Sequence, residues 1–130
     1  MMRTPDLHDD GWCLESGLER HLLHPESFPI PDEAERTSLA VGDFAKLTFL
    51  VQTEDDEDPI VDRMWVIVRE VAGDTYFGLL DNEPDIDEND EFWLGTEVPF
   101  SQEHVIEIQK GDADSPAYAA RTPLRSWPRA

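Results

Sequence analysis

Two runs of acidic residues divide the apolar part of this chain. Residues 54–58 are all acidic, and residues 81–91 hold seven acids in eleven positions. The chain carries 10 Lys and Arg against 30 Asp and Glu, a formal net charge of −20. Charge crowded in this way destabilises a compact state through self-repulsion. Both runs are therefore expected in solvated loops that interrupt a sheet.

Alternating apolar residues predict strands beside these runs. From residue 41 onward the period is two, with Ala45, Leu47, Phe49 and Val51 expected on one face. The strongest predicted strand is residues 63–71, because its apolar stretch 64–68 has no polar face and is typical of a central strand. A turn at residues 72–74 predicts a hairpin with residues 75–80.

Two further strands are predicted toward the C-terminus. Residues 97–100 form a short one, in which Pro99 indicates an edge or a bulge. Residues 105–109 form the last one, with Ile106 and Ile108 expected to face the core. Among the aromatic residues, those expected in the core are Phe49, Trp65, Phe77 and Phe100.

The N-terminal part predicts helix rather than strand. Leu14, Leu18 and Leu22 recur every four residues, which predicts a short amphipathic helix over Cys13–His24, with Asp10 as its N-cap. Pro25 ends it, and residues 28–31 are expected to be extended. One further helical turn is predicted over residues 32–36.

These elements predict one α+β domain over residues 1–130. A helical and extended lead-in (1–40) precedes a β core (41–109) and a tail (110–130) that contains Pro and Arg. We expect a strongly bent, mainly antiparallel five-stranded sheet, and a partly closed small barrel is favoured because closure removes edges.

Composition excludes several classes of partner. The first residues contain no apolar signal segment, and no apolar run approaches the ~20 residues of a spanning helix, so a cytoplasmic location is expected. A pI near 4.2 argues against binding nucleic acid or an anionic membrane. The single Cys13 cannot form an internal disulfide.

No motif indicates catalysis, a metal or another cofactor. An EF-hand loop that starts at Asp85 would place Asp90 where glycine is required, and one that starts at Asp81 would end on Phe92. Cys13, His21 and His24 match no zinc spacing. Cys13 also lacks an evident activating base, so we expect a protein that is not an enzyme.

Several motifs resemble an uncharacterised bacterial domain family that is similar to small immunity-type proteins. They are Pro25-Glu26-Ser27-Phe28, Gly42-Asp43, Met64-Trp65-Val66, Gly78-x-Leu80-Asp81-Asn82-x-Pro84, Gly95-x-x-Val98 and His104-Val105-Ile106. The resemblance covers residues 25–109 and implies binding and neutralising a toxin. It supplies no catalytic residues. Thr96-Glu97 stands where the pattern has a Gly-Asp turn.

The leading functional hypothesis is a non-enzymatic protein that offers an acidic face to a basic protein partner, in the manner of a bacterial immunity protein or antitoxin. The predicted contact residues are Asp55, Asp56, Glu57, Asp85, Asp87, Glu88, Asp90 and Trp93. Phe92 and Trp93 are either core or an aromatic anchor within the acidic rim. Two alternatives stay open: a housekeeping domain whose charge serves solubility, and a carboxylate- or metal-dependent hydrolase.

The C-terminal tail suggests an assembly. Residues 110–130 hold Lys110, Arg121, Arg125 and Arg129 against two aspartates. Such a tail could dock on the acidic face of its own chain or of a neighbour, which predicts a homodimer through the tail.

Overall fold

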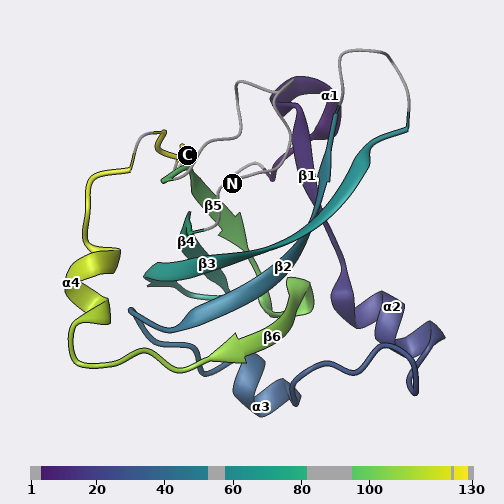
Figure 1. The fold of residues 1–130 in the computed structure, drawn as a ribbon, viewed down its shortest axis with the longest axis horizontal. Coiled ribbons are helices and arrows are strands. Elements are labelled where there is room, and N and C mark those ends of the chain that lie inside the picture. The colour runs from purple at the N-terminus through teal and green to yellow at the C-terminus, as the bar shows by residue number, and fades with distance from the viewer. Residues whose placement is uncertain (1–3, 53–57, 82–94, 124, 129–130) are drawn as a thin grey trace.

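One curled antiparallel sheet dominates the structure. A computed structural model of the chain describes residues 4–52, 58–81, 95–123 and 125–128. Within these residues the sheet has the strand order β1-β2-β3-β4-β5, and β6 also pairs with β2. The sheet curls into a half-barrel (Figure 1), which confirms the bent, mainly antiparallel prediction. The strands are β1 Trp12–Glu15, β2 Phe44–Val51, β3 Ile60–Ala72, β4 Thr75–Leu80, β5 Glu97–Phe100 and β6 Val105–Gln109.

The helices are short and lie around the sheet. The first helix is α1, and α2 and α3 follow before the long strands, as Figure 1 shows. A single 3₁₀ turn, η1, joins β5 to β6, and α4 lies in the tail. Their bounds are α1 Leu7–Asp10, α2 Gly17–Leu23, α3 Glu33–Arg36, η1 Gln102–His104 and α4 Ser115–Ala119.

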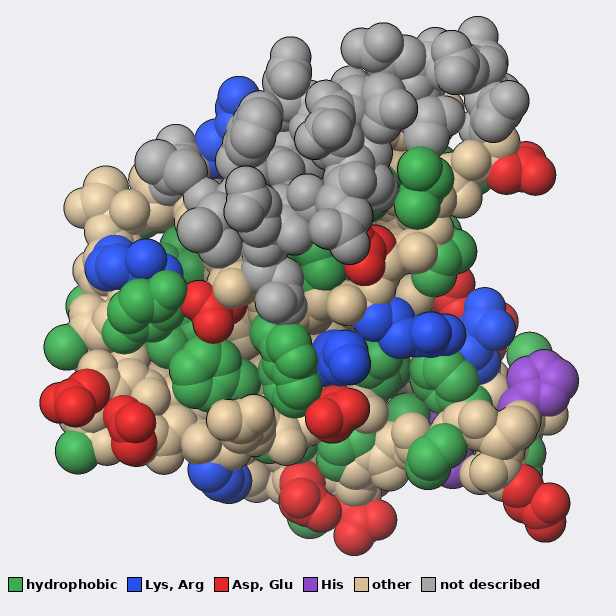
Figure 2. All heavy atoms as spheres, viewed as in Figure 1, with side chains coloured by type: hydrophobic (Ala, Val, Ile, Leu, Met, Phe, Trp, Pro, Cys, Tyr) green, Lys and Arg blue, Asp and Glu red, His purple; other side chains and the backbone are tan. Residues whose placement is uncertain are grey.

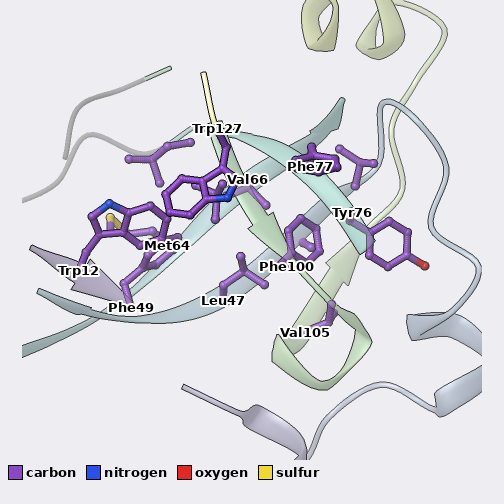
Figure 3. Close-up of a cluster of buried hydrophobic side chains, with 14 of the residues drawn as sticks. Trp12, Leu47, Phe49, Met64, Val66, Tyr76, Phe77, Phe100, Val105 and Trp127 are labelled. Carbon is purple, nitrogen blue, oxygen red and sulfur yellow. The ribbon is translucent and has the colours of Figure 1, made fainter. Parts of the chain in front are cut away.

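The core forms on one face of β2, as the alternation predicted. Ala45, Leu47, Phe49 and Val51 are fully buried and pack against residues from the neighbouring strands. Each buried apolar side chain of this size contributes about 1.5–3 kcal/mol. Figure 3 shows the aromatic members of this cluster, which include Phe77 and Phe100.

Strand β3 is central and β5 lies at the end of the strand order, as predicted. Close packing between β3 and β4 depends on Gly78. A Cβ at this position would lie 2.9 Å from Cβ and Cγ2 of Val66, so only glycine lets the two strands approach this closely.

The predicted helix over Cys13–His24 is wrong in its first half. Residues 12–15 form β1 instead, pairing Trp12 with Val51 along the edge of β2. The helix begins at Gly17, and Ser16 rather than Asp10 is its N-cap, accepting the Glu19 N–H at 3.1 Å. Backbone hydrogen bonds to β2 outweighed a weak helical periodicity, and β1 raises the sheet to six strands.

Two further expectations fail because of strand geometry. A bulge in the pairing of β2 with β6, between Lys46 and Leu47, shifts the alternation of β6. Val105 and Ile108 therefore face the core, and Ile106 packs against Gly17 of α2. Trp65 lies on the outer face of the sheet, opposite the core, where it is half-buried.

The lead-in is fixed to the sheet by polar contacts at α3. Arg36 is buried, and its guanidinium donates to the Gln102 side chain at 3.0 Å and to the Pro31 carbonyl at 2.7 Å. The Tyr76 hydroxyl donates to the Arg36 carbonyl at 2.9 Å. These bonds pair polar groups that would otherwise be buried without partners.

Candidate functional site

The strand register brings the starting points of both acidic runs to the same end of the sheet. Val51, the last residue of β2, pairs with Ile60, the first residue of β3. Leu80 ends β4 near the start of β5, because the Leu80 N–H donates to the Thr96 carbonyl. Since β4 runs antiparallel to β3, β2 and β4 run in the same direction and both end toward this end of the sheet, with Leu80 opposite Val66, six residues along β3 from Ile60.

Helix α1 adds carboxylates at the same end. It leads directly into β1, whose Trp12 pairs with Val51 (Figure 1). The Asp6 side chain caps α1, accepting the N–H groups of His8 at 2.8 Å and Asp9 at 3.0 Å. We call this part of the molecule the acidic end and define it by its described carboxylates, Asp6, Asp9, Asp10, Asp58 and Asp81.

The C-terminal tail closes the open side of the half-barrel beside the acidic end. Trp127 is only 7% exposed and packs edge-on against Trp12, with ring centroids 5.8 Å apart. Figure 3 shows its indole pointing toward Trp12. The tail also forms a parallel bridge between Arg125 and Thr96, at the edge of β5. A tail predicted to dock through its arginines therefore docks mainly through a buried tryptophan.

A buried carboxylate holds this tail in place. Glu97 is 2% exposed, accepts the Trp127 backbone N–H at 2.8 Å and lies 3.4 Å from Nε of Arg69. Arg69 also donates to the carbonyls of Ala119 and Arg121. One ion pair thus fixes two parts of the tail, and such charge-assisted bonds are stronger than neutral ones.

A shallow pocket lies where the tail meets the acidic end. Its walls include Asp10, Trp12, Glu97, Arg125 and Trp127. Asp10 and Arg125 give this pocket charges of both signs, whereas Glu97 is buried and paired with Arg69, and both indoles are almost fully buried.

Asp81 is the described residue from which the second acidic run begins, and it is tied to the tail. The Tyr118 hydroxyl donates to Oδ1 of Asp81 at 2.8 Å. This bond, together with partial burial and the negative charge of Asp81, raises the pKa of Tyr118 above its ordinary value. The contact fixes the end of β4 relative to α4.

The predicted contact residues cannot be placed. All of them, and Phe92 with them, lie outside the described residues: Asp55, Asp56, Glu57, Asp85, Asp87, Glu88, Asp90 and Trp93. What the structure adds is the position of the described residues that flank them.

Sequence reasoning missed two features of the described surface. The first is α1, whose N-cap Asp6 and two helical aspartates join the acidic end; the Asp6-x-x-Asp9 spacing of an N-cap and first turn was the available signal. The second is a set of cations formed by Lys46 and Arg63 on the outer face of the sheet and by Arg20 of α2. Basic residues at outward strand positions of so acidic a chain were the signal for these.

The described residues offer little for metal or nucleophilic chemistry. Across residues 4–52, 58–81, 95–123 and 125–128, no group of three or more His, Cys, Asp and Glu side chains could hold a metal ion. Burial raises the pKa of the Cys13 thiol, and the nearby Asp6 and Glu15 raise it further. The raised pKa favours the protonated thiol of Cys13, which is much less nucleophilic than the thiolate.

Comparison of the chain with protein-family models, with curated proteins and with solved structures found no match. In the part of the chain that the structure describes, no helix is both long and apolar enough to cross a bilayer. Function is therefore inferred from the residues of this chain alone.

Proposed function

We propose that this chain is a non-enzymatic binding domain whose acidic end docks on a basic surface of a partner protein. The strand register carries this proposal, because both acidic runs begin toward one end of the sheet and α1 adds further aspartates there. Negative charge gathered at one end attracts a basic partner toward that end and accelerates encounter more than it raises affinity.

The surroundings of the acidic end support protein recognition. The pocket beside Trp12 and Trp127, whose walls include Asp10 and Pro128, gives a partner side chain a place to insert at the edge of the charged surface. Interfaces of this kind commonly combine an aromatic anchor with a polar rim. The concrete form that we propose is a cytoplasmic bacterial immunity protein or antitoxin, for which the partner would be a toxin with a basic surface.

Association kinetics with a lysine-rich peptide test the role of the second run. One variant replaces four acids of that run with amides: Asp85→Asn, Asp87→Asn, Glu88→Gln and Asp90→Asn. A control removes the same charge from the exposed surface of α3, η1 and β6, at the opposite end of the molecule: Glu33→Gln, Glu35→Gln, Glu103→Gln and Glu107→Gln.

Stopped-flow mixing with a fluorescein-labelled decalysine gives the rate. Since electrostatic steering changes association rates by roughly 10–1000-fold, we expect the first variant to associate at least about ten-fold more slowly at low salt and to show a flatter salt dependence. The control should change the rate much less. Equal slowing in both variants would contradict the proposal and support the solubility hypothesis, because only net charge would then matter.

We also propose, as a separate point, that two copies associate through the tail. Trp127 is a core residue of the half-barrel, so exchange of tails would let each copy complete the other. Light scattering at low and high salt, on the chain with and without residues 110–130, measures the mass. An unchanged monomer mass in all four samples would count against dimerisation through the tail.

A further inference from the structure

The outer face of the sheet carries a row of cations that the acidic end does not use. On β2 and β3 the register places Lys46 opposite Trp65 and Thr48 opposite Arg63. Glu15 of β1 lies on the other side of Thr48. Figure 2 shows Lys and Arg side chains interleaved with hydrophobic ones across the middle of this view. We call Lys46, Arg63 and Arg20 the cationic strip.

Each cation of the strip lies against an aromatic ring. Nζ of Lys46 is 5.6 Å from the centre of the Trp65 ring. Phe28 contacts two guanidinium groups, with Cζ of Arg63 and of Arg20 each 5.7 Å from its centre. Cation–π contacts of this kind hold a flexible side chain in one place at small cost.

Among the described residues two of these cations form no ion pair, although Glu107 of β6 lies opposite Lys46 in the register. Arg20 forms an ion pair with Glu15 at 2.5 Å. Among the described residues, however, Lys46 and Arg63 form no ion pair, and the guanidinium of Arg63 donates no hydrogen bond. In a chain of net charge −20 this is unexpected. A guanidinium stacked on a ring keeps its N–H edge available for bidentate binding of a carboxylate.

A buried hydroxyl without a partner lies in the same row. Thr48 is 2% exposed, and its Oγ1 is the buried side-chain polar atom that finds no hydrogen-bond partner in the described part of the chain. Such groups are rare in folded proteins, because each loses its bonds to water without replacement. Thr48 lies between Glu15 and Arg63 in the register, so the residue with the unpaired hydroxyl is the cross-strand neighbour of Arg63.

The spacing of the strip indicates the form of its ligand. Lys46 and Arg63 are diagonal neighbours on adjacent strands, a relation that separates residues by about 7–8 Å. In an extended peptide, alternate side chains point the same way and lie about 6.6–6.8 Å apart. Leu50 and Val61 continue the same face as apolar neighbours.

We infer that the cationic strip binds an extended acidic segment of a partner protein, with carboxylates at alternate positions that reach Lys46 and Arg63. The intervening side chains of the segment would lie toward solvent, and its next inward residue would contact Leu50 or Val61. A nucleic acid fits less well, because it carries a negative charge on every nucleotide and the net charge of −20 repels it more strongly than a segment with acids only at alternate positions. This site is separate from the acidic end, and it binds an acidic ligand, whereas the acidic end is proposed to bind a basic one.

The test uses a fluorescein-labelled peptide in which glutamate alternates with threonine over nine residues, and the same peptide with glutamine for glutamate. Fluorescence anisotropy at low salt should show that the full chain binds the first peptide and not the second. Arg63→Gln and Lys46→Gln should each weaken binding roughly ten-fold or more, since each removes a charge-assisted bond. The affinity of Arg63→Lys for the peptide should lie between those of Arg63→Gln and the unmodified chain, because lysine keeps the positive charge but cannot bind a carboxylate through two parallel N–H groups.

The control is Lys110→Gln, whose side chain is 70% exposed and lies outside the strip. Circular dichroism melting curves should show that the variants fold as the unmodified chain does. Weakening by Lys110→Gln as large as that by Arg63→Gln would overturn the inference. So would tighter binding of a single-stranded oligonucleotide than of the peptide, or self-association in sedimentation velocity that Arg63→Gln abolishes, because each would assign the strip to another occupant.

Discussion

Replacing Trp127 with alanine should remove a large part of the stability of the domain. A buried tryptophan removes about 150–250 Å² of surface from water, which at ~25 cal/mol/Å² corresponds to about 4–6 kcal/mol. Measured losses for Trp→Ala in cores are about 3–5 kcal/mol. Because Trp127 is 7% exposed and lies in a tail that can move away, we expect about 3–4 kcal/mol.

Urea denaturation followed by circular dichroism measures this loss. With a slope of about 1.5–2 kcal/mol/M, the midpoint should fall by roughly 2 M. Trp127→Phe keeps a ring beside Trp12 and should recover about half of the loss. Leu23→Ala is the control, because this side chain is 71% exposed and its truncation should change stability by less than about 0.5 kcal/mol. A loss below about 1 kcal/mol for Trp127→Ala would show that the tail does not close the core.

Two further predictions concern single residues. Gly78→Ala should destabilise the domain by about 1–3 kcal/mol in the same denaturation assay, because its Cβ would overlap Val66; an unchanged midpoint would refute the close approach of β3 and β4. Burial lowers the pKa of His104, although Glu103 raises it, so the folded state binds this proton less readily than the unfolded state. Its contribution to stability is therefore full above the unfolded pKa of about 6.5 and is lost as the pH falls below that value. The free energy of unfolding should fall between pH 7.5 and pH 5.5, and it should fall more in the unmodified chain than in His104→Gln. An equal fall in both proteins would contradict the lowered pKa of His104.

The β core could be predicted from sequence because its signals are local. The alternation in residues 44–51 correctly predicted β2, and the turn at Gly73 correctly predicted the hairpin of β3 and β4. The apolar stretch of β3 correctly predicted that this strand lies in the middle of the sheet. The same stretch hid the orientation of Trp65, since an apolar run with no polar face does not tell which side faces the core. Strand β1 could not be predicted from local signals, because its four residues are stable as a strand only when they pair with the edge of β2.

The negative charge of the candidate site can be read from the sequence, but its position in the fold cannot. An acidic run can be read directly from a sequence. That both runs begin toward one end of the sheet follows only from the pairing of β2 with β3 and of β4 with β5. The cationic strip was hidden for a different reason. Phe28 and Arg63 are far apart in sequence, and only folding brings the ring under the guanidinium.

The edge of β2 has a consequence for how the chain folds. One half of this edge pairs with β1 and the other half with β6, strands from opposite parts of the sequence. Such distant pairings close large loops, so we expect folding in milliseconds to seconds rather than microseconds. Until both strands dock, β2 is an open edge on which a second unfolded chain can pair. The acidic run that follows β2 then acts as a gatekeeper, because like charges keep two such intermediates apart. Refolding yield should therefore fall as salt concentration rises.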